Sequence, residues 1–134
     1  MKRLHPLLAG LTCALVLLGS HLSASAAERK PFDPAAFAAA QAASAPILVE
    51  ISAPWCPTCK AQKPIIDALA AQPETKALVI FEVDFDTQKP VVRGFKAQSQ
   101  STLIAFRGKT ETARSVGDTN PASIAALVKS SLAR

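Results

Sequence analysis

Apolar residues gather in short runs along this chain, and their spacing predicts its secondary structure. Residues 47–52 form an apolar run opened by Pro46, which is typical of a buried strand. Helical spacing places Ile65, Ile66 and Leu69 on one buried face of a helix that contains Pro64. In chain order we expect a helix over 35–43, a strand over 47–52, a helix from 56–57 to about 71, a strand over 78–84, a short helix over 90–95, strands over 102–106 and 110–116, and a last helix that Asn120 and Pro121 open.

This order of elements predicts an α/β fold. Strands separated by helices favour parallel pairing, and the turn at 107–109 predicts an antiparallel hairpin at the end of the sheet. We therefore expect a mixed four-stranded sheet with helices on both faces, built from residues 46–134. Residues 27–45 precede it as a short flexible arm (27–31) and an alanine-rich helix, which Asp33 caps and Phe37 anchors.

The first 26 residues have the pattern of a secretory signal peptide. Lys2 and Arg3 are followed by an apolar run over 7–18 and by a small-residue site at 24–26, so we expect cleavage after Ala26. Lipidation at Cys13 is disfavoured because Thr12 precedes that cysteine. Export fits a bacterial periplasm best.

Removal of the signal narrows the available chemistry. The net charge falls from +5 to +3 because Lys2 and Arg3 are lost, and the chain has no run of basic residues that would support nucleic acid binding. Both histidines lie in the signal and there is no tyrosine. Thiols, carboxylates and lysines therefore carry any reaction.

Cys56 and Cys59 are the two cysteines that remain, in a C-x-x-C motif. Such a motif can be half of a zinc site or a structural disulfide. Here it follows an apolar strand and opens a helix, which favours redox work, because a helix N-terminus lowers the pKa of the first thiol. Cys56 is the expected nucleophile, and Cys59, one turn on and more buried, is expected to resolve the mixed disulfide.

The stretch from Ile47 to Lys60, ILVEISAPWCPTCK, resembles the thioredoxin family. Pro64, the aspartates at 84 and 86 and Gly117 extend the resemblance over about residues 46–133. It implies that the 47–52 strand lies centrally, between the 78–84 strand and the hairpin. It also implies that protein disulfides are the substrates and that no cofactor is needed.

The resemblance implies further roles. Glu50 corresponds to a buried acid that takes a proton from Cys59, and Trp55 and Gly117 correspond to residues that contact substrate. Glu82 stands where the family often has a lysine near the buried acid, so we expect that lysine–acid pairing to be absent.

One departure concerns the loop that faces the cysteines. The family has a cis-proline there, whereas this chain has Ser101 after Gln100. A cis bond before a residue other than proline costs about 2.5–4 kcal/mol, so we expect a trans bond. We therefore expect the backbone pairing of substrate at Gln100 to weaken. We also expect the serine to expose polar groups near the thiols, so that the two cysteines could bind a soft metal.

The sequence thus predicts an exported, monomeric thiol–disulfide oxidoreductase that reduces protein disulfides and draws electrons from a membrane dithiol donor. The alternative is a thioredoxin fold that binds a metal or a partner through its thiols without turnover. A structural domain with a passive disulfide is the least favoured interpretation.

Overall fold

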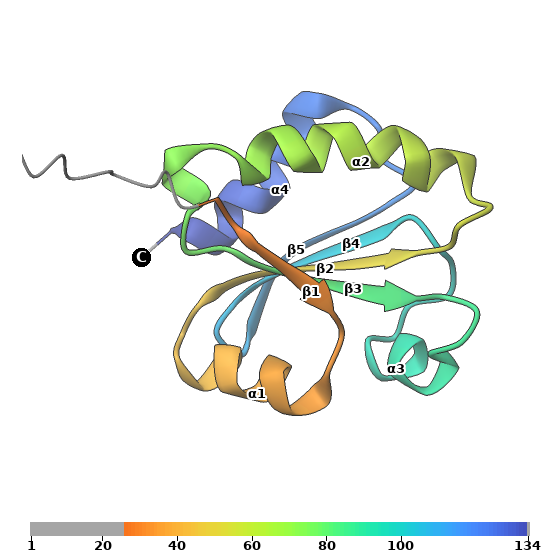
Figure 1. Ribbon diagram of the computed structural model, residues 1–134, viewed down its shortest axis with the longest axis horizontal. Helices are drawn as coiled ribbons and strands as arrows, with labels where there is room; N and C mark the ends of the chain where they lie inside the picture. Colours follow the sequence, from red (N-terminus) through yellow and green to blue (C-terminus); the bar gives the residue numbers. More distant parts are fainter. Residues whose placement is uncertain (1–25, 134) are drawn as a thin grey trace, which may run out of the picture.

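A computed structural model describes residues 26–133, and these residues form a five-stranded mixed sheet between two layers of helices (Figure 1). The spatial order of the strands is β1-β3-β2-β4-β5. The bounds are β1 Glu28–Pro31, α1 Pro34–Ala42, β2 Pro46–Ser52, α2 Pro57–Ala70, a 3₁₀ turn Pro73–Thr75, β3 Val79–Asp84, α3 Lys89–Gly94, β4 Thr102–Arg107, β5 Thr110–Val116 and α4 Pro121–Leu132. The α/β fold class and the central place of β2 are confirmed.

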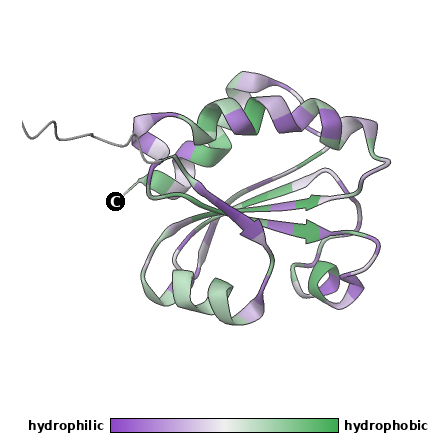
Figure 2. Ribbon diagram, viewed as in Figure 1, coloured by the Kyte–Doolittle hydropathy of each residue, from purple (hydrophilic) through white to green (hydrophobic). Residues whose placement is uncertain are grey.

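The predicted strand count was one too few, because part of the expected flexible arm forms the edge strand β1. Its residues pair in parallel with β3, from Glu28 opposite Val79 to Pro31 opposite Glu82. Residues on either side of β1 are also bonded: the Ala27 N–H donates to the carbonyl of Ala70 at the end of α2, and the Phe32 N–H donates to the carbonyl of Glu82. The strand is short, charged and hydrophilic (Figure 2), so its own side chains give no hydrophobic signal.

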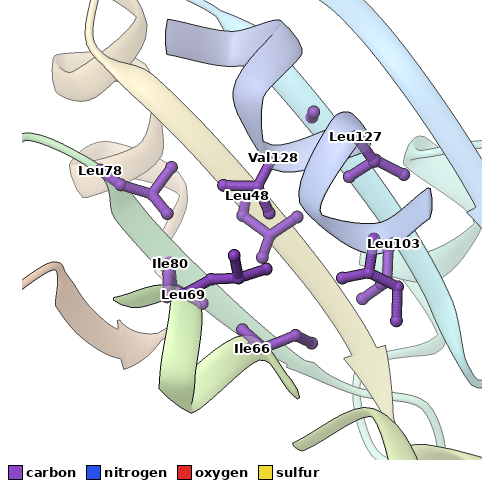
Figure 3. Close-up of a cluster of buried hydrophobic side chains, with 10 residues drawn as sticks. Leu48, Ile66, Leu69, Leu78, Ile80, Leu103, Leu127 and Val128 are labelled. Carbon is purple, nitrogen blue, oxygen red and sulfur yellow. The ribbon is translucent and has the colours of Figure 1, made fainter. Parts of the chain in front are cut away.

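Two apolar clusters fill the space between the layers. The first lies between the sheet, α2 and α4 and includes Leu48, Ile66 and Val128 (Figure 3). The second lies on the α1 and α3 side and contains Ile47 and Val49 with several phenylalanines. Because side chains alternate along a strand, the odd-numbered and even-numbered residues of β2 serve different clusters.

The helix termini follow the predicted capping residues. Asp33 accepts the Ala36 N–H at the start of α1, and Asn120 accepts the N–H groups of Ala122 and Ser123 at the start of α4. Within residues 26–133, no helix is both long and apolar enough to cross a membrane. The predicted signal peptide, including His5, Cys13 and His21, lies outside the described residues.

Candidate redox site

The two cysteines of the motif form a disulfide at the start of α2. Central strand β2 ends at Ser52, a three-residue loop follows, and Cys56 is the N-cap of the helix with Pro57 at its first position. The Cα atoms of Cys56 and Cys59 are 5.3 Å apart. The Cys56 sulfur accepts the backbone N–H of Cys59 at 3.0 Å, so one helix-end donor points at the sulfur.

The relative burial of the two cysteines is opposite to our expectation. Cys56 is 1% exposed, whereas Cys59 is only partly buried. As the N-cap, Cys56 turns its sulfur inward over the first turn of α2. Cys59 instead lines a hollow of about 500 Å³ on the β3 side of the motif. We call this space the Glu50 hollow, because Glu50 also lines it.

Glu50 lies beneath the motif, as the resemblance implied. It is an even-numbered residue of β2 and therefore shares the face of Leu48, toward α2. The residue is 8% exposed within a strand that is otherwise apolar over most of its length. A carboxyl group at such a depth needs charged or hydrogen-bonding partners.

Arg29 supplies that partner, in place of the lysine that position 82 lacks. The Arg29 Nη1 group donates to Glu50 and to Glu82, the latter at 2.9 Å, and Nη2 donates to Asp67 on α2 at 2.9 Å. Lys63 lies 3.5 Å from the other oxygen of Asp67. The cation therefore comes from the edge strand β1, two strands away from Glu50, and not from position 82.

This cluster contains three carboxylates (Glu50, Asp67 and Glu82) and two cations (Arg29 and Lys63), and their charges affect proton binding by Glu50. Burial raises the pKa of Glu50 above its ordinary value; the Arg29 charge opposes this rise, and the Glu82 charge adds to it. Glu50 therefore holds a proton more readily than a free glutamate does, and it does so beside Cys59. A group of this kind suits proton exchange with a thiol.

Trp55 lies beside the motif with most of its ring in solvent. The residue is 56% exposed, and its indole N–H donates to Asp86 at 2.7 Å. Asp84 in turn accepts the backbone N–H of Asp86 at 2.8 Å. The ring is therefore fixed by the loop after β3 and presents an apolar surface next to the cysteines.

The Ser101 loop has the predicted trans bond, since no cis peptide occurs in the described part of the chain. Its exposure differs from our expectation: Ser101 is 7% exposed, and its hydroxyl donates to the Gln100 carbonyl at 2.6 Å. The serine is therefore largely shielded from solvent, and its hydroxyl is bonded within its own loop. Its φ of 55° lies in the left-handed region, and its carbonyl accepts the Gly117 N–H at 2.9 Å.

The structure thus places the site residues in two groups. Glu50 lies with Cys59 at the Glu50 hollow, and Ser101 is bonded directly to Gly117, with Gln100 preceding it. Arg29 and the buried Gln62 were missed. Arg29 had no local signal, whereas Gln62 was visible as a polar residue on the apolar face of a predicted helix.

A disulfide that caps a helix at the end of the central strand of an α/β sheet defines the site of a thiol–disulfide oxidoreductase. The family model described as Thioredoxin matches residues 29–130. The chain therefore belongs to the thioredoxin family, and Cys56 and Cys59 are its redox-active pair.

Individual relatives agree with this membership. The chain is 37% identical over 75 residues to a thioredoxin from Chlamydia trachomatis, covering 56% of this chain and 72% of that protein. It is 32% identical over 85 residues to the bifunctional thioredoxin reductase/thioredoxin of Mycobacterium leprae, covering 63% of this chain and 18% of that longer protein. The crystal structure of Trxlp from Edwardsiella tarda EIB202 is similar with a TM-score of 0.73 at 42% identity, over 75% of this chain and 98% of that chain.

The raised pKa of Glu50 predicts a pH-dependent difference in stability between the wild type and Glu50→Gln. The folded state holds the Glu50 proton more tightly than the unfolded chain does, so this contribution is full in acid and is lost as the pH rises through the folded-state pKa. Denaturant titration should show the stability of Glu50→Gln, relative to wild type, increasing with pH and then levelling off. Each tenfold difference in proton affinity contributes about 1.4 kcal/mol. A relative stability that falls as the pH rises would mean that Arg29 dominates and lowers the pKa of Glu50.

Proposed function

We propose that the mature chain is an exported reductase of protein disulfides, in which Cys56 attacks the substrate and Cys59 resolves the product. The observation that carries the proposal is the Cys56 sulfur at the N-cap of α2, where it accepts the Cys59 N–H at 3.0 Å. Unpaired N–H groups and the helix dipole stabilise a thiolate at such a position. The buried carboxyl group of Glu50, which lines the same hollow as Cys59, disfavours a second thiolate there, and this assigns different roles to the two sulfurs.

The reaction consists of two thiol–disulfide exchanges. The Cys56 thiolate attacks one sulfur of a substrate disulfide, the substrate S–S bond breaks, and the first substrate thiolate leaves and takes up a proton. Cys59, once deprotonated, attacks the Cys56 sulfur of the mixed disulfide and releases the second substrate thiolate. The substrate gains two electrons, and the Cys56–Cys59 disulfide forms. A dithiol donor then returns the two electrons to the chain.

Glu50 serves the second exchange as the base for Cys59. Both residues line the Glu50 hollow, which connects them to solvent. The carboxylate takes the Cys59 proton, and Arg29 stabilises the charged form of Glu50 before and after that transfer. The proton then passes to water in the hollow.

Substrate contacts come from the residues around Cys56. Trp55 offers an exposed ring on one side, and Gln100, Ser101 and Gly117 form the bonded loops that the resemblance assigns to substrate. An extended peptide next to a disulfide suits such a surface, because apolar area gives affinity and backbone groups give orientation. We propose that the chain works as a monomer.

We favour the reducing direction because the Trp-Cys-x-x-Cys-Lys frame and Glu50 resemble thioredoxin more than they resemble strong oxidants. Strong oxidants of this kind owe their potential to a reduced form that is strongly stabilised. Here the Cys56 sulfur accepts one backbone N–H, from Cys59, and the buried acid Glu50 lines the same hollow as Cys59. The direction requires a dithiol donor, and for an exported chain we propose a membrane protein in that role.

The metal-binding alternative gains no support from the Ser101 loop. It rested on the missing proline and on polar groups of Ser101 near the thiols, and the Ser101 hydroxyl instead bonds to the Gln100 carbonyl. Within residues 26–133, no group of three or more histidine, cysteine or acidic side chains is arranged to hold a metal ion. We therefore carry the reductase forward as the proposal.

Trapping with an insulin disulfide tests the order of the two cysteines. We expect Cys59→Ser to accumulate a mixed disulfide through Cys56, because the resolving thiol is absent, and wild type to reduce insulin with dithiothreitol as donor. Cys56→Ser should form no adduct, and the double variant is the control for non-specific capture. Since Cys56 is the more buried cysteine, an adduct at Cys59 in Cys56→Ser, with none at Cys56, would reverse the assigned roles.

Export predicts the N-terminus of the mature protein. The first anchored residue in the described part is Ala27, whose N–H donates to the Ala70 carbonyl at 2.9 Å, so cleavage after Ala26 leaves the fold intact. We expect N-terminal sequencing of the protein from the periplasm of a Gram-negative host to begin at Ala27. Deletion of residues 2–26 should retain it in the cytoplasm. A full-length chain in the membrane fraction would contradict this expectation.

A further inference from the structure

Gln62 is a polar residue on the buried face of α2, one turn after Cys59. It is 3% exposed, and burial at that level is costly for an amide without hydrogen-bond partners. Its Nε2 group donates to the Asp118 carbonyl at 2.8 Å and to the Ser101 carbonyl at 3.2 Å. The amide N–H groups therefore donate to two backbone oxygens, which belong to separate loops.

Those two loops are far apart in the sequence and are joined to each other. Ser101 precedes β4, whereas Asp118 follows β5. The Ser101 carbonyl also accepts the Gly117 N–H at 2.9 Å. Together these bonds join the helix that carries the disulfide, the Ser101 loop and the Gly117–Asp118 loop, and we call this arrangement the Gln62 clamp.

The conformation of Ser101 explains why a clamp is needed. Its φ of 55° is unfavourable for a residue with a side chain, and such a conformation persists only where the surroundings determine it. Local bonds contribute, since the Ser101 hydroxyl donates to Gln100 and the Thr102 hydroxyl donates to Ser99 at 2.8 Å. These bonds shape the loop internally, but Gln62 is the side chain that ties it to α2.

We propose that Gln62 is a positioning residue that holds the Ser101 and Gly117 loops in register with the Cys56–Cys59 pair. A proline at position 101 could not adopt this backbone, because its ring fixes φ at about −65°, so the clamp stabilises a loop of a different shape. Because both donors to the Ser101 carbonyl come from the protein itself, that oxygen is occupied before any peptide arrives. The inference rests on the proposed function in so far as these loops receive the substrate peptide.

The test replaces Gln62 by methionine, which keeps the length and volume of the side chain and removes both donors. We expect the KM for insulin to rise about fivefold to tenfold, consistent with two lost hydrogen bonds, while kcat changes less than twofold. The reaction with a small aromatic disulfide should keep the wild-type rate, because that substrate does not reach the loops. Gln72→Met, beyond the far end of α2 and with no side-chain hydrogen bond recorded, is the matched control.

A second readout does not depend on turnover. Hydrogen exchange of the Gly117 amide, measured by NMR, should be faster in Gln62→Met than in wild type or Gln72→Met, because the Ser101 carbonyl loses its anchor. If wild type fails to reduce insulin but Gly117 exchange responds, the clamp stands and the proposed function falls. Unchanged Gly117 exchange, or equal losses with insulin and the small disulfide, would overturn the clamp.

The variant Gln62→Glu provides a second test in case Gln62→Met misfolds. An ionised carboxylate has the shape of the amide but faces two carbonyl oxygens without a donor, so it should raise the KM for insulin at least as much. Protonation in mild acid restores one O–H donor, and the KM ratio of this variant to wild type should then fall. A ratio that is constant with pH would contradict the role assigned to the donor.

Discussion

The ion pair between Glu50 and Arg29 is the interaction on which this site depends. The Glu50 carboxyl group lies in the central strand and is largely buried, and without a partner its ionisation would be disfavoured. Arg29 reaches it from β1 and also contacts Glu82 and Asp67, so one guanidinium joins two strands and the dithiol helix. Through Arg29, the four-residue edge strand β1 therefore contributes to the chemistry of the site.

Packing holds this charged cluster in place from both sides of the sheet. Ile66 and Leu69 fix α2 in the first apolar cluster (Figure 3). The helix thereby keeps Cys59 at the hollow that Glu50 also lines. On the opposite face of the sheet, Phe32 directly follows β1, and its ring centroid lies 5.4 Å from that of Phe37 in α1. The residues that place Arg29 are therefore part of the core, although Arg29 itself is polar.

Features set by local patterns could be predicted from the sequence. The apolar run of β2, the caps at Asp33 and Asn120 and the late hairpin each depend on neighbouring residues, and each was found in place. The family pattern added the site of the disulfide and the position of Glu50.

Features set by distant partners could not be predicted. The polar β1 is a strand because the edge of β3 accepts it, and Arg29 matters because that pairing carries it to Glu50. The greater burial of Cys56 likewise depends on how its side chain caps α2 in three dimensions. These outcomes arise from tertiary contacts, which leave no periodic trace in the sequence.

The most direct test of the account is the reduction potential of the Cys56–Cys59 pair in the mature protein, measured by equilibration with defined thiol buffers. The frame around the two cysteines and the buried acid Glu50 resemble those of thioredoxin more than those of strong oxidants. The account therefore predicts a potential of about −250 mV or lower, toward the reducing end of the known range. A value near about −120 mV would contradict it and would make the chain an oxidant of protein thiols.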